Sequence, residues 1–114
     1  MGRPQQPGAD SIGTLDLLIL SRLAQGPMHG FGIAEYLHQV SDAALRVEEG
    51  SLYPALHRLE SQGFVESTWG VSENNRRARF YKLTPRGRKQ VTIKIVDWRR
   101  MVKAVNRVID PLVS

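Results

Sequence analysis

The sequence contains no cysteine, and aromatic residues make up only 7% of its 114 positions. The lack of cysteine excludes a disulfide scaffold, a thiolate metal site and a cysteine nucleophile. No stretch approaches the roughly 18 uninterrupted apolar residues of a membrane-spanning helix, and residues 1–8 lack the apolar segment of a secretory signal. We therefore expect a cytoplasmic protein that inserts into no membrane. With 41% hydrophobic and 24% charged residues, a chain of this length predicts one globular domain with one core.

Acidic residues are scarce in the last part of the chain. Residues 1–70 contain four lysines and arginines against eight acidic residues, whereas residues 71–114 contain twelve against three. The first segment therefore has a net charge of −4 and the second a net charge of +9. This asymmetry indicates a polyanionic partner, either nucleic acid or an acidic membrane surface, although a solvated basic helix face would give the same count.

Hydrophobic periodicity divides the chain into helices and one hairpin. Residues 1–13, rich in proline, glycine and glutamine, predict a flexible N-terminal arm. A helical period predicts a first helix from an N-cap at Thr14, a second with Val40 among its buried residues, and a third with Pro54 in its first turn. These three helices are expected at about residues 14–25, 29–40 and 50–62. A period of two then predicts a β-hairpin, with strands near residues 65–69 and 79–83 and a polar turn at 70–77.

A last helix is expected from Thr84 and Pro85 to about Ile109. Its apolar residues follow spacings of 4, 3, 4, 3 and 4, as in the seam of a coiled coil. A helix of this length is roughly 38 Å long, more than three short helices can cover. We therefore predict that residues 85–114 form a C-terminal dimerisation helix. The seam consists of Val91, Ile95, Trp98, Val102, Val105 and Ile109.

The order helix–helix–helix–hairpin–helix predicts a mainly α fold with a small β-hairpin, a winged helix-turn-helix at residues 14–84. In this fold the third helix enters the major groove of DNA and the hairpin is the wing. Three arginines and two asparagines in the wing are suited to phosphate and minor-groove contacts, whereas the nearly neutral third helix is suited to reading base edges. The wing residues are Asn74, Asn75, Arg76, Arg77 and Arg79, and the helix residues are Ser51, Tyr53 and His57.

Several segments resemble PadR-type transcriptional regulators. They are Gly13–Leu20, His29–Ile33, Gly50–Glu60 with its Leu-Tyr-Pro-x-Leu-x-Arg-Leu-Glu core, and Arg79–Thr84. The resemblance covers roughly residues 13–100, and the chain is similar to the short-tailed type. It implies a homodimeric bacterial repressor, and the two-fold symmetry of a homodimer predicts a pseudo-palindromic operator. It also implies that the DNA-binding elements are the third helix and the wing. Many relatives respond to phenolic acids or bulky aromatic drugs, so a small aromatic effector is a further possible partner.

Other classes of function were weighed against DNA binding. His29, His38 and His57 are far apart and lie in no catalytic motif, and Gly30-x-Gly32 lacks both a third glycine and a preceding strand. We therefore expect no enzymatic activity, no cofactor and no metal site. Two alternatives remain open. One is a winged-helix module that binds another protein through its near-neutral third helix, and the other is an aromatic-ligand sensor that uses Trp98 at the dimer interface.

Overall fold

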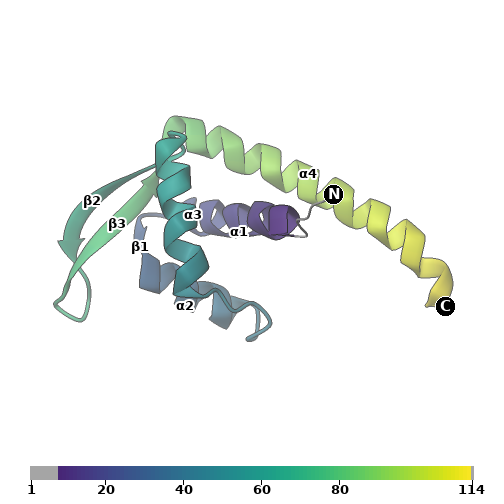
Figure 1. Cartoon of the computed structure of the whole chain (residues 1–114), viewed down its shortest axis with the longest axis horizontal. Coiled ribbons are helices and arrows are strands. Elements are labelled where there is room, and N and C mark those ends of the chain that lie inside the picture. Colours follow the sequence, from purple (N-terminus) through teal and green to yellow (C-terminus); the bar gives the residue numbers. More distant parts are fainter. Residues whose placement is uncertain (1–7, 114) are drawn as a thin grey trace.

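The computed structural model describes residues 8–113, with side chains from Thr14 onward. Three helices pack together, a hairpin projects from one end, and a long fourth helix crosses the group and extends beyond it (Figure 1). This arrangement confirms the predicted mainly α fold with a small β-hairpin, to which β1 adds a third strand. Its elements are α1 (Gly8–Leu23), β1 (Met28–His29), α2 (Gly30–Val40), α3 (Glu49–Ser61), β2 (Val65–Val71), β3 (Arg77–Leu83), α4 (Pro85–Ile109) and the short 3-10 helix η1 (Asp110–Leu112).

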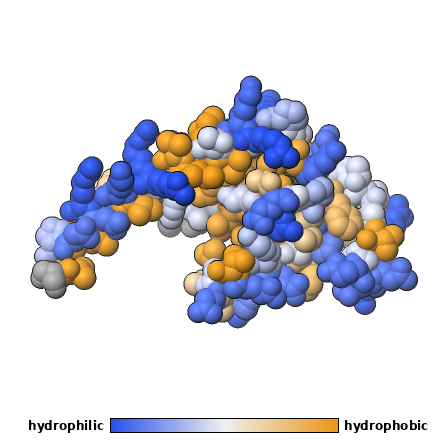
Figure 2. All heavy atoms as spheres, turned by 180° about the vertical axis from the view of Figure 1, so that it is seen from behind, coloured by the Kyte–Doolittle hydropathy of each residue, from blue (hydrophilic) through white to orange (hydrophobic). Residues whose placement is uncertain are grey.

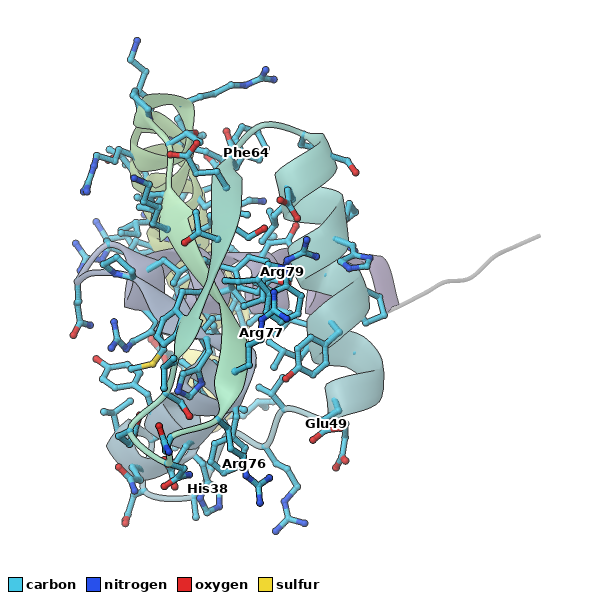
Figure 3. The ribbon with its side chains drawn as sticks, turned by 90° about the vertical axis from the view of Figure 1, so that its left-hand side faces the viewer. His38, Glu49, Phe64, Arg76, Arg77 and Arg79 are labelled. Carbon is cyan, nitrogen blue, oxygen red and sulfur yellow. The ribbon has the colours of Figure 1, made fainter. Side chains whose placement is uncertain are left out.

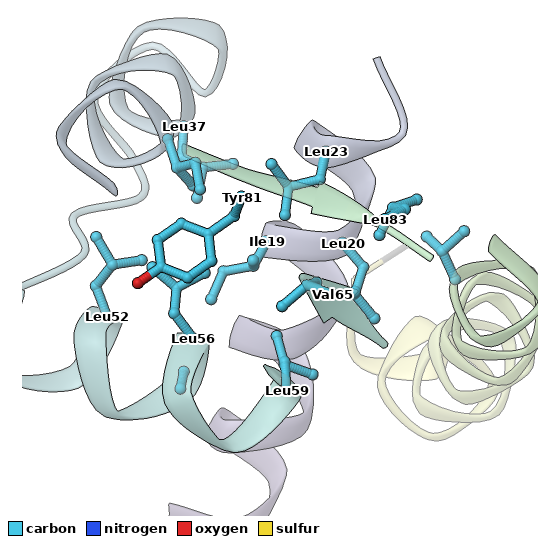
Figure 4. Packing of buried hydrophobic residues seen from close by; sticks show 13 residues of the cluster. Ile19, Leu20, Leu23, Leu37, Leu52, Leu56, Leu59, Val65, Tyr81 and Leu83 are labelled. Atoms are coloured by element: carbon cyan, nitrogen blue, oxygen red, sulfur yellow. The ribbon is translucent and has the colours of Figure 1, made fainter. Parts of the chain in front are cut away.

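The core forms where α1, α2 and α3 meet the base of the sheet (Figure 4). The inner faces of the three helices supply aliphatic side chains at helical spacing, and β3 adds Tyr81 and Leu83. Burying these side chains is the main stabilisation available to a domain of this size. The largest fully buried side chains are Ile19, Leu20, Leu23, Ile33, Leu52, Leu56, Leu59 and Val65.

The sheet has three antiparallel strands in the order β1-β3-β2. In the hairpin, β2 and β3 pair from Val65 opposite Leu83 to Val71 opposite Arg77. The five residues 72–76 join them. The amide of Asn75, at φ 58°, donates to the carbonyl of Ser72, and the amide of Ser72 donates to the carbonyl of Arg76. This is a turn followed by one left-handed residue, a common way to close a hairpin.

α4 begins as predicted. Thr84 is the N-cap, its hydroxyl accepting from the amide of Gly87 at 3.0 Å and donating to the carbonyl of Gly63 at 2.6 Å. A Cβ at Gly87 would lie 2.0 Å from the carbonyl oxygen of Phe64, so only glycine lets α4 approach this loop so closely. Among residues 8–113, no helix is long and apolar enough to cross a membrane.

Three expectations about individual elements were wrong, and one short strand was missed. α1 begins at Gly8 rather than Thr14, because no proline interrupts the helix there, so residues 8–13 of the predicted arm are helical. Residues 1–7 of that arm lie outside the described part of the chain. α3 begins at Glu49, which makes Pro54 its sixth residue rather than part of its first turn. Val40 is 60% exposed because α2 ends there, beyond the core. The strand β1 was not predicted, since two residues are too few to show a period.

Candidate nucleic-acid interface

The outer face of α3 presents two of the three residues predicted to read base edges, Tyr53 and His57. The inner face of the helix is fixed in the core by Leu52, Ala55, Leu56 and Leu59. Helical periodicity therefore directs the opposite face to solvent, and Ser51, Tyr53 and His57 are all exposed. Tyr53 and His57 are about 40° apart around the helix, whereas Ser51 is about 160° from Tyr53 and lines a hollow with Thr14 and Glu48. The structure therefore brings Tyr53 and His57 together and leaves Ser51 on another side of α3.

Tyr53 also has a packing role that the sequence did not reveal. A Cβ at Gly30 would lie 2.6 Å from Cε1 of Tyr53 and 2.8 Å from its hydroxyl oxygen, so the ring lies directly against the backbone at the start of α2. Partial burial and the nearby carboxylate of Glu49 raise the pKa of the Tyr53 phenol. The hydroxyl therefore stays protonated at neutral pH and can donate as well as accept a hydrogen bond.

The wing presents all five predicted contact residues, from Asn74 to Arg79, as exposed side chains. Arg77 and Arg79 point from the hairpin toward the side occupied by α3, and Arg76 lies at the tip (Figure 3). The guanidinium carbons of Arg77 and Arg79 lie 4.7 Å and 5.4 Å from the ring centre of Trp69, which is itself 57% exposed. Asn75 has a structural reason to be present, because asparagine tolerates its left-handed conformation.

One acidic residue of the wing turn faces the body of the domain. The Nδ1 atom of buried His29 accepts from the amide of Gly32 at 3.0 Å, which places the proton of the neutral ring on Nε2. That Nε2 atom lies 3.5 Å from Oε1 of Glu73. A hydrogen bond to its own backbone, and then the bond to His29, lower the pKa of the Glu73 carboxyl. Sequence patterns could not predict this contact, because its partners are 44 positions apart.

A second contact connects α3 with the base of the wing. The hydroxyl of Ser67 in β2 donates to Oε2 of Glu60 in α3 at 2.7 Å. Tyr81 of β3, on the same face of the hairpin as Ser67, is buried in the core. These contacts therefore fix the position of the hairpin relative to α3. A fixed position is required if both elements are to contact one ligand.

The predicted seam on α4 divides into two parts. Val91 is only 7% exposed and Ile95 packs beside it, so both contribute to the core of their own chain. The side chain of Val91 is therefore already buried within its own chain and offers little surface to a second chain. This corrects its assignment to the seam. Trp98, Val105 and Ile109 remain 43–46% exposed and Val102 is partly exposed. The C-terminal part of α4 extends beyond the other helices (Figure 1). Hydrophobic side chains gather along this helix next to strongly hydrophilic ones (Figure 2).

The part of α4 beyond the domain carries additional apolar side chains that the spacing rule missed. Met101 is 55% exposed and Val108 is 74% exposed. At 100° per residue both lie beside Val105 rather than opposite it, so they widen the exposed seam. We call the set Trp98, Met101, Val102, Val105, Val108 and Ile109 the α4 stripe.

Comparison with known proteins gives consistent matches. Residues 19–93 match the model of the transcriptional regulator PadR-like family. The chain is 38% identical over 76 residues to the transcriptional regulator Rv3488 of Mycobacterium tuberculosis, covering 67% of each protein. It is 43% identical over 72 residues to an uncharacterized 37.1 kDa protein in transposon TN4556 of Streptomyces fradiae, but spans only 19% of that protein's length. The structure of a transcriptional regulator from Clostridium thermocellum is similar with a TM-score of 0.77 at 33% identity, covering 86% of this chain and 93% of that one.

Proposed function

Because the chain belongs to the PadR-like family of transcriptional regulators, we propose that it represses transcription by binding a pseudo-palindromic DNA operator as a homodimer. In this proposal α3 enters the major groove, where Ser51, Tyr53 and His57 read base edges. The wing contacts phosphates or the minor groove through Asn74, Asn75, Arg76, Arg77 and Arg79. Binding an operator also requires the cytoplasmic location that the sequence led us to expect.

One observation carries the proposal: Arg77 and Arg79 point from the wing toward α3, into the same region as the exposed face of that helix. A duplex lying against α3 would bring its phosphates to these guanidinium groups. Neither arginine forms an ion pair with a carboxylate among the described residues, so both charges are available to an anion. A surface with neutral hydrogen-bonding side chains beside free arginines suits a ligand that has both base edges and phosphates.

The α4 stripe supports the homodimeric part of the proposal. A symmetric pair of stripes would cover the apolar side chains that α4 carries beyond its own domain. Pairing would also present two copies of α3 to one duplex, and copies about 34 Å apart would read two half-sites one turn apart.

The proposal is tested by measuring affinity for random duplex DNA and for duplexes selected from a random library, each at several salt concentrations. We expect selected duplexes to bind more tightly than random ones. We also expect affinity for both to fall with salt, because phosphate contacts release counterions. Equal affinity for selected and random duplexes would contradict a sequence-specific regulator. Binding that is absent or insensitive to salt would instead favour the protein-interaction module.

The exposure of Trp98 on the α4 stripe favours a second role, as the site of a flat aromatic effector. Two copies near a symmetry axis would offer two indole faces for stacking. We expect aromatic compounds to quench tryptophan fluorescence in a saturable way and to weaken DNA binding. Because Trp69 also emits, the quenching must disappear in Trp98→Phe. A panel of planar compounds without a saturable response would leave Trp98 with a packing role only.

A further inference from the structure

We propose that Trp69 is a positioning residue for DNA binding, whose exposed indole holds Arg77 and Arg79 in the orientation that meets phosphate. The inference rests on the proposed function, since it concerns how the wing engages DNA. It assigns a role to a residue that the sequence identified only as part of an alternating strand.

The three side chains lie on one face of the hairpin. Trp69 is directly opposite Arg79 in the strand register, and Arg77 is two residues closer to the turn in β3. All three side chains therefore share the face of Ser67 and Tyr81. That face contacts α3 at its base, through Ser67 and Glu60, and enters the core through Tyr81. Farther from the core, it carries the indole and the two guanidinium groups.

Core packing does not account for the indole. Trp69 is 57% exposed and lies beyond Val65 and Ser67, the residues of its face that reach the core and α3. Both guanidinium groups lie within the distance at which an aromatic ring attracts a cation. The phenol of buried Tyr81 is a second neighbour of Arg79, because burial raises the pKa of Tyr81 and the Arg79 guanidinium opposes that rise.

The stack affects how the arginines can bind. A free arginine loses rotamer freedom when it is fixed against a phosphate, which reduces the affinity gained from the contact. A guanidinium held beside an aromatic face has already lost much of that freedom, while the N–H groups in its plane remain able to donate to phosphate oxygens. Lysine, a flexible point charge, gains less from the ring, so arginine and lysine are not equivalent at positions 77 and 79.

The test compares Trp69→Leu with the wild-type protein in binding a random duplex over a range of salt concentrations. We expect the affinity to fall by a factor of about two to five for each wing in contact, the size of an exposed cation–π contact. The slope of affinity against salt should stay unchanged, because every positive charge remains. Trp69→Phe, which keeps an aromatic face, should recover most of the loss.

Two further variants separate positioning from hairpin packing. In an Arg77→Gln/Arg79→Gln background the salt slope should become less steep, and Trp69→Leu should then have no further effect, because the residues through which it acts are gone. Thr68→Ala, on the opposite face of β2, is the matched truncation control and should bind as the wild type does. Circular dichroism and thermal unfolding verify that each variant is folded.

The inference would be overturned if Trp69→Leu bound DNA like the wild type, or if it weakened DNA binding equally with and without the two arginines. In either case the proposed function would stand. Wild-type protein that shows no salt-dependent DNA binding would overturn the proposed function, and this inference with it.

Discussion

Arg58 of α3 donates a short hydrogen bond to the carboxylate of Asp16 in α1, and so ties the candidate recognition helix to the first helix of the core. Asp16 is 7% exposed. Burial raises the pKa of its carboxyl, while Arg58 and, to a smaller extent, Lys94 of α4 oppose that shift. The net rise means that the folded protein holds a proton on Asp16 more readily than the unfolded chain does. This residue therefore contributes less to stability as pH rises above 3.8 through its folded pKa.

Removing Arg58 should make this pH dependence larger. In Arg58→Ala the buried carboxylate loses its main partner, which we expect to lower the free energy of unfolding by about 1–3 kcal/mol at neutral pH. The pKa of Asp16 should rise further, so the deficit should shrink as pH is lowered and the carboxyl takes up a proton. Urea unfolding at neutral pH and at mildly acidic pH measures this. Arg46→Ala removes an exposed arginine as a control, and an equal deficit at both pH values would show that Asp16 is not the group responsible.

The wing arginines should account for much of the salt dependence of DNA binding. If Arg76, Arg77 and Arg79 of two subunits each contact a phosphate, the slope of log affinity against log salt is about −5. Replacing all three by glutamine should flatten that slope and weaken binding to operator and random duplexes alike. Lys82→Gln removes a charge from the other face of the hairpin and is the matched control. An unchanged slope in the triple variant would remove the wing from the interface.

Base reading by α3 should be visible as a loss restricted to the operator. Tyr53→Phe removes the hydroxyl but keeps the ring that packs against Gly30, and His57→Ala removes an exposed side chain. Each should cost roughly 1–3 kcal/mol of binding free energy on the operator and little on random DNA. His38→Ala, an exposed histidine in the last turn of α2, serves as the control. Equal losses on both kinds of DNA would show that these residues position the protein rather than read bases.

The contact between His29 and Glu73 should hold the turn of the wing. In Glu73→Ala we expect faster hydrogen exchange at the amides of Ser72 and Asn75, which close that turn. Glu66→Ala is the matched control, because Glu66 pairs with Lys82 at the base of the hairpin. Exchange measured by NMR distinguishes the two variants, and the same rates in both would mean that His29 does not restrain the wing.

Local patterns predicted the elements of this fold well and the contacts between them poorly. The N-cap at Thr84, the end of α4 at Ile109 and the buried leucines of α3 all follow from spacing within one segment. Such patterns carry no information about which distant segments meet. The stack of Arg79 on Trp69 and the approach of Tyr53 to Gly30 depend on strand register and helix packing, which form only when the whole chain is folded.

The same limit affected the predicted seam on α4. The heptad spacing places Val91 and Val105 on one side of the helix, and both are indeed on the apolar side. Spacing alone cannot show that Val91 is covered by α1 and the sheet while Val105 lies beyond them. The division follows from the length of α4 relative to the domain, a property of the fold rather than of the helix.

A homodimer closed by the α4 stripe should be disrupted by a charge at its centre. Each fully buried large apolar side chain contributes roughly 1.5–3 kcal/mol, and a half-exposed one about half of that. The six residues of the stripe on two chains then give a gross gain of order 10 kcal/mol, within the range of about 4–15 kcal/mol that association costs. Since gain and cost are close, one change within the stripe should decide whether the chains pair.

Val102→Glu is that change, because it would bring two carboxylates together in the middle of the paired stripes. We expect a folded monomer of 12.8 kDa in light scattering at low micromolar concentration, with far weaker binding to the operator. Lys103→Glu introduces the same side chain one position later, on the basic flank of α4, and should leave a dimer. Weaker DNA binding by Val102→Glu alone would link pairing to operator recognition, since Val102→Glu changes the net charge of each chain by one unit and Lys103→Glu changes it by two. A mass that stays at twice 12.8 kDa in Val102→Glu would mean that the α4 stripe is not the dimer interface.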